Sequence, residues 1–158
     1  MGEVWRMRAE LDDEVVGAPI WPEGIRVRTF RAGDGRSVHS LLEHGYRHGG
    51  GSVDAFETWL PRMTSDDEFD PELWFLAEAG GELAAAALCW TSAFVKDLVV
   101  HERWRRRGLG EALLRHVFAV FRARGATAVE LKVQSDNSAA IRLYERVGMR
   151  VSERLSSA

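Results

Sequence analysis

The spacing of apolar residues predicts strands and helices that follow one another along most of the chain. Apolar residues that alternate with polar ones indicate a strand, and apolar residues that recur every three or four positions indicate one face of a helix. We therefore expect strands at residues 4–11, 25–30, 73–78, 82–90, 94–100 and 128–134, helices at 36–46, 53–62, 110–124 and after 137, and a last strand after 148. Residues 79–81, Ala-Gly-Gly, predict a hairpin turn, and Pro61 is expected to end the second helix.

The stretch from residue 94 to residue 124 joins an apolar strand to an amphipathic helix through a basic turn. The unpaired backbone N–H groups and the positive dipole end of a helix start bind anions, and glycine lets a phosphate come close to the backbone. The turn combines these features with three arginines, so it predicts a pyrophosphate site. Its residues are Arg105, Arg106, Arg107, Gly108, Leu109 and Gly110.

Two common phosphate-binding loops do not fit this turn. A P-loop needs Lys followed by Ser or Thr after its second glycine, which is absent here. The dinucleotide fingerprint needs a third glycine at the position where Leu113 stands. The turn instead shows arginine, two residues, glycine, one residue and glycine, beginning at Arg105.

A second motif follows the strand at residues 128–134. Asn137 is followed at fixed distances by Ala140, Tyr144 and Gly148. In these two motifs and their separation, the sequence resembles the GNAT superfamily of acetyl-CoA-dependent N-acetyltransferases. The resemblance implies an α/β (α+β) fold with a mixed, mostly antiparallel central sheet flanked by helices.

The C-terminus departs from the family pattern, because only ten residues remain after Gly148. They suffice for a sixth strand of the domain and leave the seventh short or missing. We hypothesise that residues 4–11 fill the vacant sheet position, from the same chain or swapped from a partner, since an open edge invites unwanted pairing. Residues 1–24, with Pro19 and Pro22, also resemble the linker that precedes the C-terminal half of tandem GNAT proteins of the mycothiol synthase type, although a simple extension fits as well. Residues 25–158 would then form a single GNAT domain.

The resemblance also implies an active site. The pyrophosphate of acetyl-CoA would lie on the basic turn, and its pantetheine arm would follow the strand edge at Leu98, Val99 and Val100, where a backbone N–H near Leu98 or Val99 would bind the thioester oxygen. Asn137 would help to bind the pantetheine arm. Tyr144, at the family's tyrosine position, would protonate the leaving thiolate, or would simply pack against its helix neighbours.

The base that deprotonates the acceptor amine is not evident from the sequence. Counting by twos from Leu98, the face expected to meet the acceptor carries Lys96 and Phe94, whereas Asp97 is expected to point the other way. Lys96 would pair with a carboxylate on the acceptor or lie at the solvated rim. Four residues elsewhere could take the proton through water, although each also fits an ordinary surface position. They are Glu43, His44, His48 and Glu57.

Composition and charge narrow the function further. The halves of the chain differ in charge: residues 1–90 hold 8 Lys and Arg against 17 Asp and Glu, and residues 91–158 hold 13 against 7. The basic half suits a phosphate-bearing cofactor and the acidic half a cationic amine, although both also fit ordinary solvated surface. The single cysteine, Cys89, offers no disulfide framework or cysteine metal site, and the chain shows neither a signal peptide nor a membrane-length apolar run. We therefore expect a cytoplasmic protein that binds no metal and no membrane.

Three functional readings remain open from the sequence. The favoured one is an N-acetyltransferase that uses acetyl-CoA and a primary amine, with homodimerisation left open. The alternative is a non-catalytic acyl-CoA-binding domain with a sensing or partnering role, which the missing base favours. A nucleic-acid-binding module built on Arg103 and the basic turn is the third, and the overall acidity, a net charge of −3, argues against it.

Overall fold

The structure, a computed structural model, describes residues 2–47 and 51–156. Its helices and strands follow the predicted order. The elements are β1 (Glu3–Glu10), β2 (Ile25–Thr29), α1 (Gly35–Gly45), α2 (Phe56–Thr64), β3 (Trp74–Ala79), β4 (Glu82–Trp90), β5 (Phe94–Val100), α3 (Leu109–Ala123), β6 (Ala128–Gln134), α4 (Ser138–Arg146) and β7 (Arg150–Ser156), with 3-10 turns at Pro71–Leu73 and Glu102–Trp104.

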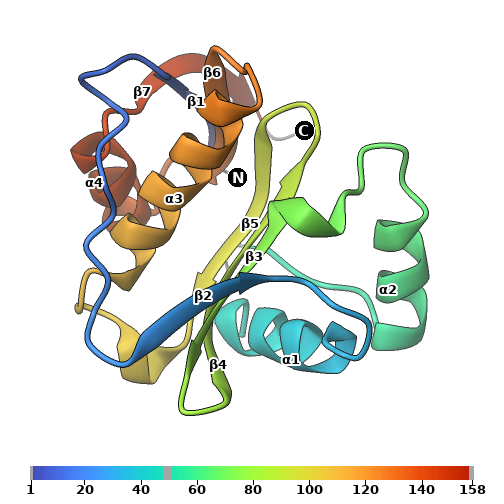
Figure 1. The fold of residues 1–158 in the computed structure, drawn as a ribbon. Helices are drawn as coiled ribbons and strands as arrows, with labels where there is room; N and C mark the ends of the chain where they lie inside the picture. Colours follow the sequence, from blue (N-terminus) through green and yellow to red (C-terminus); the bar gives the residue numbers. More distant parts are fainter. Residues whose placement is uncertain (1, 48–50, 157–158) are drawn as a thin grey trace.

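The strands form one seven-stranded sheet in the order β2-β3-β4-β5-β6-β1-β7. Neighbouring strands are antiparallel except β5 and β6, which run parallel. Helices α1 and α2 cover one face of the sheet, and α3 and α4 cover the other (Figure 1). The predicted mixed, mostly antiparallel sheet flanked by helices is confirmed.

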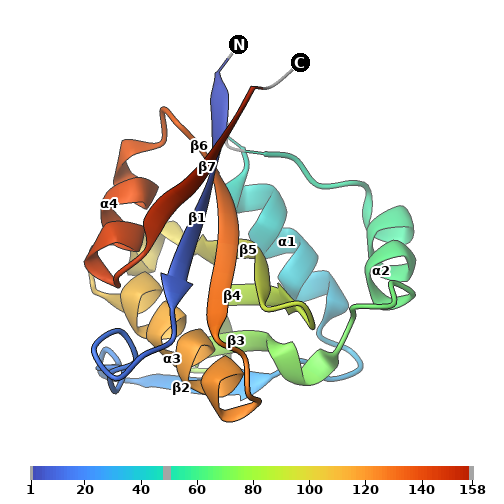
Figure 2. The same ribbon diagram turned by 90° about the horizontal axis from the view of Figure 1, so that it is seen from above.

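The N-terminal strand occupies the vacant position in the sheet. β1 lies between β6 and β7 and pairs antiparallel with both. Val4 lies opposite Gln134 of β6, and Glu3 lies opposite Ser156 of β7. This confirms the predicted pairing, here within one chain. β7 supplies the strand expected after Gly148, and it lies beside β1 (Figure 2).

Two apolar cores lie on the two faces of the sheet. The larger one packs α3, whose buried residues include Leu113, Val117 and Phe118, against the sheet. The smaller one packs α1 and α2 on the other face, around Trp59 and Trp74. Four consecutive alanines of β4, residues 84–87, are buried between the two layers. Their small side chains allow helices to approach both faces of this strand.

The second helix differs from its prediction. α2 begins at Phe56 and continues past Pro61 to Thr64, whereas the sequence predicted a helix that ends near the proline. Proline removes only its own N–H donor, and its carbonyl still accepts a hydrogen bond from the N–H of Ser65 at 3.0 Å. The helix therefore continues for one further turn.

Candidate active site

The sheet opens between its two parallel strands. β5 and β6 pair only at Phe94 with Glu130 and at Val95 with Leu131, and beyond these pairs the strands diverge. The divergence leaves a cavity of about 240 Å³. The cavity is lined by both strand edges, by the end of α1, by the start and inner face of α4, and by β1. The lining residues are Val4, Tyr46, Val95, Lys96, Asp97, Leu98, Leu131, Lys132, Val133, Gln134, Asn137 and Tyr144.

The edge of β5 offers backbone groups to this cavity. The N–H of His101 donates to the carbonyl of Ala84 on β4 at 2.8 Å. Because backbone groups alternate in direction along a strand, the N–H groups of Leu98 and Val100 point away from β4, toward the opening. Val99 directs its N–H to β4, and its side chain is buried against α1. Of the two residues predicted to donate a backbone N–H to the thioester oxygen, the register favours Leu98.

The predicted anion turn lies at the other end of the same edge. Gly108 adopts a left-handed conformation (φ 79°) directly before α3, and no side chain caps this helix start. The first N–H groups of α3 and the positive end of its dipole therefore face outward. A cavity of about 420 Å³ adjoins the turn. It is lined by Val100, Trp104, Arg105, Arg106, Gly108, Leu109, Gly110, Glu111, Ala139, Ala140, Leu143 and Arg146.

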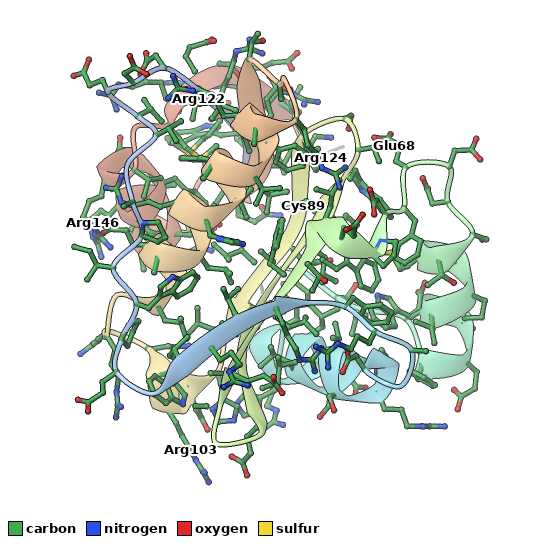
Figure 3. All side chains as sticks on the ribbon, in the orientation of Figure 1. Glu68, Cys89, Arg103, Arg122, Arg124 and Arg146 are labelled. Atoms are coloured by element: carbon green, nitrogen blue, oxygen red, sulfur yellow. The ribbon has the colours of Figure 1, made fainter. Side chains whose placement is uncertain are left out.

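The arginines of the turn differ in what they contact. Arg105 Nε donates to the carbonyl of Val100 at 3.3 Å and so ties the turn to β5. Arg106 has a positive φ of 63° and lines the cavity. Arg107 instead stacks on Trp104, with 4.9 Å from its guanidinium carbon to the ring centre, and does not line this cavity. Arg103 points outward from the molecule in Figure 3 and is exposed.

Glycine is required at two points of the turn for different reasons. A Cβ on Gly108 would meet no atom within 4 Å, so this position needs glycine only for its backbone conformation. A Cβ on Gly110 would lie 3.2 Å from Leu143 of α4, so this glycine allows α3 and α4 to approach closely.

The two motif residues of α4 lie at the cavity between β5 and β6. Tyr144 is 8% exposed, and burial raises its pKa to about 12. The phenol therefore keeps its proton at any physiological pH. Asn137 caps α4, because its side-chain oxygen accepts from the N–H of Ala140 at 3.3 Å. Its amide nitrogen is the group that remains for a ligand.

Asp97 points away from the face of Leu98, as expected: it contacts Tyr46 beside α1, whereas Leu98 packs with the core under α3. The expectation that no carboxylate lies at the site was wrong. Asp97 lies opposite Leu88, and the next pair joins Val95 to Cys89, so Lys96 is an extra residue in β5, a β-bulge. The bulge breaks the alternation only beyond Asp97, where Val95 packs with the core under α3, and leaves the alternation between Leu98 and Asp97 intact. Asp97 is 5% exposed and lines the cavity, so a carboxylate is present at the site after all.

Asp97 forms a close contact with Tyr46, a residue that the sequence did not single out. The Tyr46 hydroxyl donates to Asp97 Oδ1, and burial together with this carboxylate raises the tyrosine's pKa. Asp97 Oδ2 has no hydrogen-bond partner among the described residues. The ammonium of Lys96 lies 3.6 Å from that oxygen, within ion-pair range but too far for a hydrogen bond. The charged Asp97 in the middle of a buried strand was the signal that could have found this site.

The other candidate bases lie elsewhere. Glu43 faces His39 at 3.5 Å and is 61% exposed. His44 stacks on the His101 ring, at 5.0 Å between ring centres. Glu57 is exposed on α2, and none of these residues lines the cavity between β5 and β6. His48 lies outside the described residues.

The sheet thus opens between two parallel strands, with an uncapped helix start at one end of the opening and the buried groups of Asp97 and Tyr144 at the other. The chain belongs to the acetyltransferase (GNAT) family, whose model matches residues 37–149.

Relatives with curated names match nearly the whole chain. The chain is 32% identical to the mycothiol acetyltransferase of Thermobispora bispora, covering 92% of this chain and 52% of that protein. It is 28% identical to the mycothiol acetyltransferase of Streptomyces griseus, covering 96% and 51%. The chain thus spans about half the length of the curated relatives it matches, and it resembles one half of a tandem GNAT protein.

Solved structures show the same fold. A GCN5-related N-acetyltransferase from Sphaerobacter thermophilus superimposes with a TM-score of 0.83 and 36% identity, over 98% of this chain and 50% of that one. The ribosomal-protein-S18-alanine N-acetyltransferase of Escherichia coli shares the fold, with a TM-score of 0.65 and 22% identity over 78% of this chain and 76% of that one. Among the described residues, no helix has the length and apolar character needed to cross a membrane.

Proposed function

We propose that this protein transfers the acetyl group of acetyl-CoA to a primary amine by direct attack within a ternary complex. One observation carries the proposal: the opening beside β5 has an anion-binding helix start at one end and Asp97 with Tyr144 at the other. The two cavities follow one another along the strand edge, from Leu98 to Val100. A long donor with phosphates at one end and a thioester at the other fits this arrangement.

The chain's own groups suit each part of the donor. Backbone N–H groups from Arg106 to Gly110 would receive the pyrophosphate, with the dipole of α3 behind them. The strand edge from Leu98 to Val100 would receive the pantetheine arm, and the amide nitrogen of Asn137 would bind it from α4. Acetyl-CoA supplies an activated acyl group whose thioester is more readily attacked than an amide.

Leu98, Asp97 and Tyr144 would stabilise the developing charge and transfer the protons. The N–H of Leu98 would donate to the thioester oxygen, a contact typically worth about 3 kcal/mol in acyl transfer. Asp97 Oδ2, which has no hydrogen-bond partner among the described residues, would accept the proton of the entering ammonium group. Tyr144, which burial keeps protonated, would donate its proton to the departing thiolate. The presence of this carboxylate at the site favours catalysis over simple binding.

Calorimetric titration with acetyl-CoA tests the cofactor site. We expect micromolar binding to the wild-type protein and none to Gly108→Trp, because an indole would fill the space beside the helix start. Gly33→Trp is the matched control, since Gly33 also has a positive φ (99°) and open space around its Cβ but lies in the turn before α1. Equal binding by Gly108→Trp and Gly33→Trp would contradict the assignment.

Release of free thiol over a panel of amines then tests catalysis. The panel includes the des-acetyl form of mycothiol, because the curated relatives are named mycothiol acetyltransferases. Thiol release that depends on one amine would establish the acceptor class. Binding of acetyl-CoA without transfer to any amine would leave the non-catalytic reading in its place.

A further inference from the structure

Both lysines of this chain lie at the candidate active site. The sequence contains 19 arginines but only two lysines, Lys96 and Lys132. Both line the cavity between β5 and β6, one from each strand. An arginine remains protonated at any accessible pH, whereas a lysine can lose a proton and act as a nucleophile.

Lys96 and Lys132 differ in their surroundings. Lys96 is the extra residue of the bulge in β5, its side chain is 46% exposed, and its Nζ lies 3.6 Å from Asp97 Oδ2. Lys132 is exposed on β6, and among the described residues no carboxylate lies within ion-pair distance of its Nζ. Only Lys96 therefore has its amine beside the carboxylate that would deprotonate an acceptor.

We propose that Lys96 is an internal acceptor, so that the protein acetylates its own Lys96 Nζ. This inference rests on the proposed function, because the acetyl group comes from acetyl-CoA at the same site. Leu98, whose N–H would bind the thioester oxygen, is two residues away on the same strand. The flexible side chain of Lys96 would let its amine approach the thioester carbon from the side of Asp97.

The chemistry balances with the groups present. Asp97 Oδ2 takes one proton from the Lys96 ammonium, and the neutral amine attacks the thioester carbon. A C–N bond forms and the C–S bond breaks, which yields an amide on Lys96 and the CoA thiolate. Tyr144 protonates that thiolate and recovers its proton from the nitrogen that has been acylated.

Mass spectrometry can separate the two lysines directly. Cleavage at arginine alone places Lys96 in the fragment of residues 63–103 and Lys132 in the fragment 125–142. The purified protein is incubated with acetyl-CoA and no added amine. General acid–base catalysis contributes about 10²–10⁴-fold, so we expect Lys96 to gain one acetyl group at least about 100-fold faster than Lys132. The first-order rate should not change with protein concentration, because donor and acceptor are held by the same molecule.

Variants connect the reaction to the site. Lys96→Arg, which adds a cleavage site, should show no acetylation of its 63–96 and 97–103 fragments, whereas Lys132→Arg should still acetylate Lys96. Asp97→Asn, checked for native circular dichroism, should slow the reaction by about 10²-fold, and Gly108→Trp should abolish the preference for Lys96. Equal labelling of the two lysines, or labelling of Lys96 that persists in Gly108→Trp, would overturn the proposal.

The proposal and the function it rests on can fail separately. A protein that binds acetyl-CoA and acetylates an added amine, yet leaves Lys96 unmodified, overturns self-acetylation and leaves the proposed function standing. A protein that does not bind acetyl-CoA in the calorimeter overturns both.

Discussion

Replacing Tyr46 with Phe tests whether the Tyr46–Asp97 contact stabilises the reactive end of the cavity. The substitution removes only the hydroxyl that donates to Asp97 Oδ1. Asp97 is 5% exposed, and its Oδ2 has no hydrogen-bond partner among the described residues. The variant would therefore bury a carboxylate whose nearest compensation is the Lys96 ammonium at 3.6 Å.

The expected cost follows from these contacts. A hydrogen bond to a charged group contributes about 1.5–3 kcal/mol, and a buried polar group left unsatisfied costs about 1–3 kcal/mol. Because Lys96 offsets part of the stranded charge, we expect Tyr46→Phe to lower the free energy of unfolding by about 2–3 kcal/mol. For a chain of this size, that corresponds to a fall in Tm of roughly 5–10 °C.

A double-mutant cycle isolates the contact from the rest of the substitution. In an Asp97→Asn background no charge is stranded, so Tyr46→Phe should there cost only about 1 kcal/mol. Urea unfolding of the wild-type protein, the two single variants and the double variant, followed by tryptophan fluorescence, gives the coupling energy, expected at about 1–2 kcal/mol. If Tyr46→Phe costs the same in both backgrounds, the contact contributes nothing specific and the reasoning is refuted.

The other tyrosine, the N-terminal strand and one glycine each give a further test. Burial raises the pKa of Tyr144 from 10.0 to about 12. The stability that this shift contributes is therefore complete below pH 10 and is lost as the pH rises. Near pH 11, urea unfolding should show a loss of about 1.4 kcal/mol in the free energy of unfolding, and Tyr144→Phe should lack this loss. Deleting residues 1–11 removes the strand that pairs with β7, so gel filtration should show aggregation, and a native monomer would contradict this. Gly45→Ala places a Cβ 2.5 Å from Val99 Cγ1 and should destabilise by about 1–2 kcal/mol in urea, whereas Gly17→Ala, with its nearest atom at 3.8 Å, should change little.

Local sequence was enough to predict most elements of this fold. β4, β5 and β6 lie where the apolar runs placed them, and α3 begins one residue before its predicted start. These elements are visible locally because apolar periodicity, glycine at a helix start and a capping asparagine each act within a few residues of chain. The anion turn was predicted for the same reason, since the strand, the glycines and the helix are consecutive in sequence. Asn137, which caps α4, and Tyr144, which lies in it, belong to one short motif.

The extent of α2 and the pairing partners of β1 were harder to predict from the sequence. Pro61 is a strong local signal, but packing of Trp59 and Met63, both buried, outweighs the loss of one hydrogen bond. The sequence suggested that residues 4–11 fill a gap in the sheet. Only the three-dimensional pairing with β6 and β7 shows that they do so within one chain.

The sequence by itself determined the family, the order of the elements and the glycine turn between β5 and α3, because each depends on contacts between near neighbours in the chain. Only the tertiary structure decided that Asp97 belongs to the site. That depends on the divergence of β5 from β6, which pair only at Phe94 and Val95 and so leave Asp97 lining a cavity. The tertiary structure also decided that Tyr46, the residue directly after α1, reaches this carboxylate. A register and a contact between distant segments are fixed by how whole elements pack, and no short stretch of sequence contains that information.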